Sequence, residues 1–105
     1  MSDIISKKID KKTTFNLIAN SEHIMKVVDQ KIVVTGIMFS AQAGKECAYI
    51  ITGDEALFTD GTTLISELRK FGALFENEIL SNGVEIIVSQ AVSSKGKTVY
   101  KITIV

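Results

Sequence analysis

The chain has 105 residues, 46% hydrophobic and 23% charged, a composition typical of one globular domain and unlike that of a disordered segment. Twelve basic residues balance twelve acidic ones. This excludes a basic overall charge as a reason to expect nucleic-acid binding, whereas a local basic surface remains compatible with it. The single cysteine excludes an internal disulfide. No apolar run approaches the length of about 20 residues that spans a membrane, so we expect a cytoplasmic protein.

Residues 1–12 contain four lysines and no hydrophobic stretch that would make a secretory signal. We expect them to form a flexible, charged lead-in to a single domain of residues 13–105. Residues 13–28 leave two alternatives open. A strand begins near Phe15, or residues 21–29 form a short helix capped by Asn20 or Ser21. The helix is the favoured interpretation.

Three strands are predicted in the first half of the domain. Residues 31–39 are rich in β-branched side chains, and Gly36 within them indicates a bulge or a sharp bend. Residues 41–45 form a turn, residues 46–52 the second strand, and residues 53–55 a tight turn before a short third strand at residues 56–59.

A helix follows over residues 62–75. The apolar residues at helical spacing are Leu64, Leu68, Phe71 and Phe75, widened by Ile65 and Leu74, and the N-cap is Asp60, Thr62 or Thr63. Residues 81–83 then form a turn. Residues 84–89 and 98–105 alternate as strands, and the loop of residues 93–97 joins them into a hairpin.

Three strands, a helix and two strands are the element order of the five-stranded Greek-key barrel called the OB-fold. We therefore predict a β-rich α+β domain, a five-stranded OB-like barrel with one helix between strands three and four. A helix packed on an open meander has the same element order and remains an alternative.

The sequence offers little for catalysis. His23 and Cys47 have no partner at a recognised spacing, and together they are too few for a zinc site. We interpret Cys47 as a buried hydrophobic residue and His23 as part of a solvated helix face. The carboxylates are scattered, and Asp54 and Asp60 have structural interpretations as turn and cap residues. We expect no enzymatic activity, no metal and no cofactor.

Binding to single-stranded nucleic acid needs aromatic platforms beside basic groups. Candidates for both occur on or near the predicted strands, and the hairpin loop of residues 93–97 corresponds to an OB-fold loop that borders the ligand. The aromatic residues alternate with aliphatic ones, so a place in the core is the alternative for each. The candidate site residues are Lys31, Phe39, Lys45, Tyr49, Phe58, Arg69, Lys95, Lys97, Tyr100 and Lys101.

Residues 49–71 (YIITGDEALFTDGTTLISELRKF) combine a strand, an acidic turn, an aromatic–Thr pair and a helix start. Residues 84–105 (VEIIVSQAVSSKGKTVYKITIV) combine a strand, a Lys-Gly-Lys turn and a final strand with a tyrosine. Over residues 31–105 this pattern resembles the small single-stranded DNA-binding proteins of tailed phages of Gram-positive bacteria. The resemblance implies a non-catalytic OB-like domain that coats single strands during phage DNA replication. The sequence differs from such proteins in two respects, since it has no tryptophan and no long acidic C-terminal tail.

A protein-interaction or structural module, such as a small phage inhibitor or virion component, is the alternative function. Zero net charge and outward β-branched residues such as Ile87 and Val99 favour it. Under either hypothesis we expect a homo-oligomer, because the hydrophobic final strand requires a partner strand or a covering element.

Overall fold

The computed structural model describes residues 4–6, 10–42 and 44–105. Part of the predicted lead-in, residues 1–3 and 7–9, lies outside the described residues. In the remainder, Ile4–Ser6 form strand β1 and Lys11–Ala19 form helix α1, so this part of the lead-in has regular structure. Asp10 caps α1, since its Oδ1 accepts a hydrogen bond from Thr13 N–H at 2.7 Å. Hydrogen bonding to Thr13 holds the pKa of Asp10 below its ordinary value.

The short helix predicted over residues 21–29 is replaced by two smaller elements. Glu22–His23 form strand β2, and Ile24–Val27 form the 3-10 helix η1. Ile24 of η1 is fully buried, and Val27 is partly buried against the same core. The described residues thus contain two α-helices, of which α2 was predicted between the third and fourth strands and α1 was not predicted.

The larger sheet contains five strands in the order β1-β4-β5-β6-β2. Its centre is an antiparallel meander of β4 (Gly36–Gln42), β5 (Lys45–Thr52) and β6 (Glu55–Thr59), as the strand and turn pattern predicted. Gly53 has a φ of +69°, which its tight turn requires. At the edges, β1 pairs antiparallel with β4, and β2 pairs parallel with β6.

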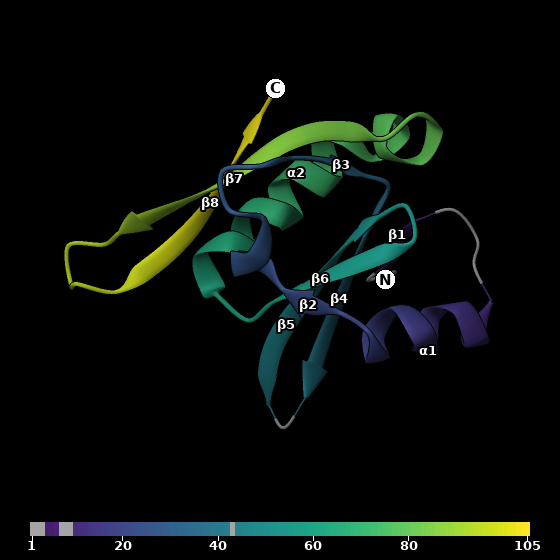
Figure 1. Ribbon diagram of the computed structural model, residues 1–105, viewed down its shortest axis with the longest axis horizontal. Helices are drawn as coiled ribbons and strands as arrows, with labels where there is room; N and C mark the ends of the chain where they lie inside the picture. Colours follow the sequence, from purple (N-terminus) through teal and green to yellow (C-terminus); the bar gives the residue numbers. More distant parts are fainter. Residues whose placement is uncertain (1–3, 7–9, 43) are drawn as a thin grey trace.

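The smaller sheet contains β3 (Lys31–Val34), β7 (Val84–Val92) and β8 (Thr98–Ile104) in the order β3-β7-β8. The β7–β8 hairpin projects from the body at the left of Figure 1. The sequence predicted this hairpin, although β7 is three residues longer than expected.

The two sheets share the segment predicted as one strand over residues 31–39. This segment pairs with β7 before Thr35 and with β5 after it, so the chain crosses from one sheet to the other at Thr35. Thr35 N–H donates to Ile51 O at 2.8 Å, and Thr35 Oγ1 accepts from Gly53 N–H at 3.0 Å. The bend predicted at Gly36 therefore exists, and it transfers the chain between sheets.

Helix α2 spans Thr62–Ser81 and is longer than the predicted 62–75. The predicted stripe is buried at Leu64, Leu68 and Phe71, but Leu74 is 78% exposed and does not belong to it. Phe75 has non-helical angles (φ −115°, ψ 20°), which kink the helix where the stripe ends. The N-cap is Gly61 without a side-chain hydrogen bond, so the predicted caps do not act as such.

Two hydrophobic clusters hold the fold together. The inner cluster lies between the sheets and α2 and includes Val34, Ile50, Leu68 and Val88. The outer cluster lies on the opposite face of the five-stranded sheet and consists of Leu17, Met38, Cys47, Tyr49, Ile51 and Ala56, with Phe58 packed against them. Both faces of the central strands are therefore apolar, because odd and even residues of β5 contribute to different clusters.

The architecture is thus α+β and strand-rich, with two sheets and two α-helices. Among the described residues, β6 and β8 do not pair and no closed barrel forms. β2 occupies the free edge of β6. On the edge of β8, Glu67 of α2 accepts a hydrogen bond from Ile102 N–H at 3.0 Å. At this position, α2 supplies the covering element that the final strand was expected to require.

Candidate nucleic-acid interface

The structure divides the predicted site residues into three groups. Three are aromatic residues on β5, β6 and β8, four are lysines of the smaller sheet and its hairpin loop, and three lie on β4, β5 and α2. These groups are the ring chain of Tyr49, Phe58 and Tyr100, the basic set of Lys31, Lys95, Lys97 and Lys101, and the clamp of Phe39, Lys45 and Arg69.

The ring chain is completed by His23, which the sequence analysis placed on a solvated helix face. His23 is exposed, but it lies on β2 with its ring centroid 6.3 Å from that of Phe58 and 6.1 Å from that of Tyr100. Phe58 in turn lies 5.5 Å from Tyr49. The four rings therefore connect β5, β6, β2 and β8, and no local sequence signal links His23 to them.

The rings differ in their access to solvent. Tyr49 is only 5% exposed, and burial raises the pKa of its phenol above the ordinary value. Tyr49 is therefore not open to a stacking base in this conformation, whereas Phe58 and Tyr100 are half-buried. His23 Nδ1 accepts a hydrogen bond from Met25 N–H at 3.1 Å, which orients its ring between the other two.

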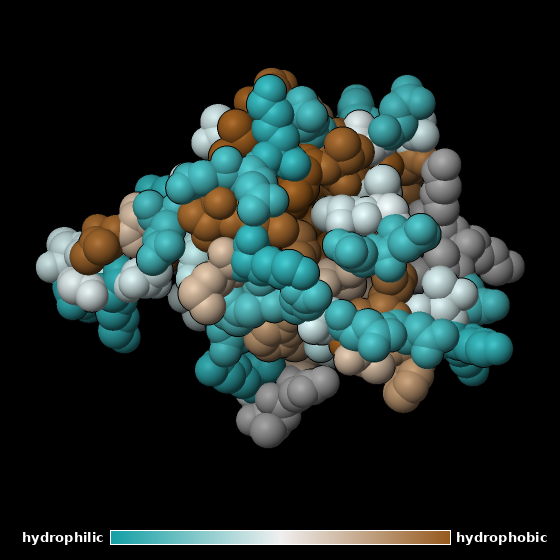
Figure 2. All heavy atoms as spheres, viewed as in Figure 1, coloured by the Kyte–Doolittle hydropathy of each residue, from teal (hydrophilic) through white to brown (hydrophobic). Residues whose placement is uncertain are grey.

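The basic set follows the smaller sheet and its hairpin. Lys31 of β3 lies opposite Ile87 of β7, which lies opposite Thr103 of β8. Two residues along the same face, Ser89 of β7 lies opposite Lys101 of β8. These residues share the face directed away from the inner cluster, since Ile86 and Val88 alternate with them and are buried. Lys95 and Lys97 are exposed at the hairpin tip, and the projection at the left of Figure 2 carries both hydrophilic and hydrophobic side chains.

None of these four lysines forms an ion pair with another described residue. The strands and hairpin that carry them contribute a single carboxylate, Glu85. The smaller sheet is therefore a locally basic surface on a chain whose net charge is zero.

The two positive charges of the clamp are each paired with a carboxylate. Lys45 Nζ lies 3.2 Å from an Asp60 carboxylate oxygen, and Arg69 pairs with Glu46. The Arg69 guanidinium also lies 4.3 Å above the centroid of the Phe39 ring, at cation–π distance. Arg69 thus joins α2 to β4 and β5, and Lys45 joins β5 to the segment before α2, so a structural role accounts for these residues.

The rings and the basic set do not share one groove. Along β8, Tyr100 points to the inner cluster and Lys101 to the opposite face, because neighbouring residues of a strand alternate. In the smaller sheet, Tyr100 and Lys101 therefore lie on opposite faces, so the predicted combination of a stacking ring beside this lysine does not form.

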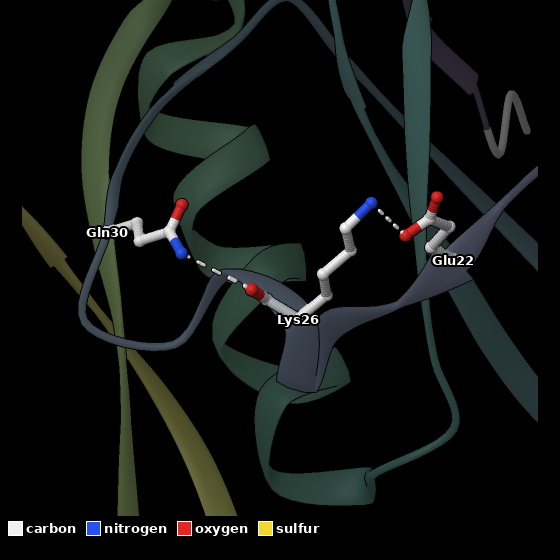
Figure 3. A network of polar contacts seen from close by, with 3 residues as sticks. All are labelled: Glu22, Lys26 and Gln30. Carbon is white, nitrogen blue, oxygen red and sulfur yellow. Dashed lines mark hydrogen bonds and ion pairs between the residues drawn. The ribbon is translucent and has the colours of Figure 1, made fainter.

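A cavity of about 660 Å³ lies between α1, β2, η1 and the β5–β6 turn, and the sequence analysis did not anticipate it. Its apolar wall includes Leu17, Ile51 and Ala56. At its rim, Lys26 pairs with Glu22, and Lys26 O accepts a hydrogen bond from the Gln30 side chain at 3.4 Å (Figure 3). The hydrogen bond to Glu22 raises the pKa of Lys26 above its ordinary value.

Side chains that could bind a metal ion are scattered over the part of the chain that the structure describes. There, no cluster of three or more His, Cys, Asp or Glu side chains is arranged to hold a metal ion. Cys47 is buried, in agreement with its interpretation as a hydrophobic residue. No helix within the described ranges is long and apolar enough to cross a membrane.

Comparison of the chain with protein-family models, with curated proteins and with solved structures gives no match.

Proposed function

We propose that this chain is a non-catalytic, cytoplasmic single-stranded DNA-binding protein with an OB-like fold that coats single strands during phage DNA replication. The strand order supports the fold proposal. When β3 and β4 are treated as one bent strand, the order β7, β3/β4, β5, β6 is the 4-1-2-3 order of a Greek key. In chain order, helix α2 lies between the third of these strands, β6, and the fourth, β7. The helix of an OB-fold has the same place.

The basic set is the observation that carries the functional proposal. Its lysines are exposed and free of ion pairs with described residues, in contrast to Lys45 and Arg69. From the level of Lys31 to Lys97, the distance along β8 is about 20 Å at the usual rise per strand residue. A basic track of this length suits the site of several nucleotides, from about 4 to 16, that one OB domain covers.

Binding of fluorescently labelled oligo-dT, measured by polarisation at low salt, tests the proposal. We expect the variant with all four lysines of the basic set changed to alanine to lose binding. The matched control changes Lys45 and Lys70, exposed lysines outside the basic set, and is expected to bind normally. Absence of binding by the unmodified chain, or an equal loss in the control, would overturn the proposal.

A second candidate is a protein-interaction module that acts through a homo-oligomer. Exposed apolar side chains of the smaller sheet favour it, because Val33, Val92 and Ile104 are 43%, 72% and 44% exposed. Sedimentation of the chain without nucleic acid distinguishes the candidates. A concentration-dependent dimer that dissociates on Val33→Asp substitution supports this second function, and a monomer at every concentration counts against it.

A further inference from the structure

Helix α1 contacts the rest of the described chain mainly through one side chain. Leu17 is its single buried residue, while Phe15 is 69% exposed and Ile18 lies at the surface. Within the described residues, Leu17 is also the one member of the outer cluster that does not belong to β4, β5 or β6. One leucine thus attaches the helix to the apolar face of the sheet.

Polar interactions add nothing to this attachment among the described residues. The hydrogen bonds of α1 and its flanking residues are local, from Thr13 and Thr14 to Asp10, from Asn20 to Asn16, and from Ser21 to Ile18. No ion pair of the described chain includes a residue of α1. The helix is stabilised internally but not tied to its neighbours by hydrogen bonds.

The contact surface beneath α1 is also incomplete. The cavity of about 660 Å³ is bounded on one side by Thr13, Asn16, Leu17 and Asn20 of the α1 segment and on the other by the sheet. Side chains that face an open space lack the dispersion contacts that a packed interface provides. α1 accordingly covers the sheet without filling the space between them, and it lies at the lower right margin of the molecule in Figure 1.

We propose that α1 is a displaceable cover, a helix that leaves the outer face of the five-stranded sheet as a unit while both sheets stay folded. Elements with few buried apolar contacts open at a lower free energy than the global unfolding of a domain, and lids belong to this class. The cavity is already open to solvent at its polar rim, and displacement of α1 removes one of its walls and uncovers the side of the outer cluster that Leu17 protects. The basic set lies on the other sheet and stays in place on opening, whereas Tyr49 and Phe58 of the ring chain belong to or pack against the outer cluster.

Chemical modification of Cys47 can be used to measure the displacement of α1. It is the single cysteine of the chain and a buried member of the outer cluster. We expect displacement of α1 to expose the outer cluster along β5 as far as Cys47, so the rate at which a thiol reagent modifies Cys47 measures this opening without any assay of nucleic-acid binding. We expect modification in the absence of denaturant to proceed through local opening, with a rate almost insensitive to low denaturant concentrations.

Leu17→Ala weakens the one apolar contact of the cover and is expected to accelerate Cys47 modification by about tenfold or more. Ile18→Ala, on the exposed side of the same helix, is the matched control and should leave the rate nearly unchanged. Val88→Ala destabilises the inner cluster instead. It should lower global stability without a comparable acceleration.

Two results would overturn the proposal. In the first, the rate of Cys47 modification rises with denaturant as steeply as global unfolding does. In the second, Leu17→Ala accelerates modification no more than Val88→Ala at equal loss of global stability. Either result means that the outer cluster opens only when the whole domain unfolds.

Discussion

Glu67 Oε1 accepts a hydrogen bond from the backbone N–H of Ile102 at 3.0 Å, and this contact joins the middle of α2 to the free edge of β8. An unpaired edge N–H in a sheet is otherwise a template for association with another strand. A carboxylate from a helix therefore occupies the position that a neighbouring strand would take in a closed barrel.

Replacement of Glu67 by alanine is expected to destabilise the domain by about 1 kcal/mol, because the half-buried Ile102 N–H loses its acceptor. Glu67→Gln retains an oxygen at this position and should lose less. Denaturant unfolding of both variants measures the difference. Equal stability of Glu67→Ala and the unmodified chain would mean that water replaces the carboxylate without cost.

Salt dependence gives a second check on the proposed function. For single strands, each neutralised phosphate contributes about 0.7 to the slope of log binding constant against log salt concentration. Each lysine of the basic set changed to alanine should therefore lower the slope by about this amount. Lys45→Ala should not change the slope, because Asp60 already pairs with Lys45.

Gly83, with a φ of +80°, begins the turn into β7 and allows a close approach to β3. A Cβ at Gly83 would lie 2.6 Å from Val33 Cγ1 and 3.2 Å from Val34 O. Gly96 has a similar φ of +78° but has no atom within 4 Å of such a Cβ. We expect Gly96→Ala to cost about 1 kcal/mol from backbone strain and Gly83→Ala at least about 1 kcal/mol more from overlap with β3. Thermal or denaturant unfolding of the pair separates these effects.

The buried phenol of Tyr49 is expected to make the folded chain less stable at alkaline pH. Burial raises the pKa of its phenol, so the folded chain keeps this proton at a pH where the unfolded chain releases it. The contribution to stability is complete below the unfolded pKa of about 10 and is lost as the pH rises through the folded pKa. Tyr49→Phe should lose less stability than the unmodified chain between neutral and alkaline pH in denaturant titrations, and identical losses would contradict the prediction.

We expect Arg69→Lys to lower the stability of the fold, although Arg69 lies at the surface. Its guanidinium stacks on Phe39 and pairs with Glu46, and a lysine ammonium cannot make both planar contacts. Because both charged groups are substantially exposed, the loss on Arg69→Lys should stay below about 1 kcal/mol. A double-mutant cycle with Phe39→Leu measures the stacking part, and a coupling free energy of zero would contradict it.

Elements with local signals could be predicted from the sequence. The meander of β4, β5 and β6 and the β7–β8 hairpin follow from alternation and glycine turns, and the start of α2 follows from the spacing of its buried leucines. The extension of α2 to Ser81 was missed because Phe75 has non-helical angles and Ile79 is the one buried residue of the helix beyond it, which is too little to show a helical stripe.

Helix α1 and the ring chain show why the remaining features were missed. α1 buries only Leu17, so its sequence carries almost no helical periodicity, and the cap at Asp10 is its one clear signal. The ring chain depends on the parallel pairing of β2 with β6 and on the position of β8, both of which are tertiary. Spacing identified Tyr49, Phe58 and Tyr100 separately, but only the folded chain brings His23 between Phe58 and Tyr100.

The crossing at Thr35 has a consequence for how this domain assembles. The meander pairs neighbouring segments and can form early, whereas β3 must wait for residues 84–87, far along the chain. During that interval the backbone groups of β3 are without their ladder partners, and Val33 and Val34 are open to intermolecular pairing. Slow refolding with transient aggregation, relieved at low protein concentration, is the kinetic signature of a strand that serves two sheets.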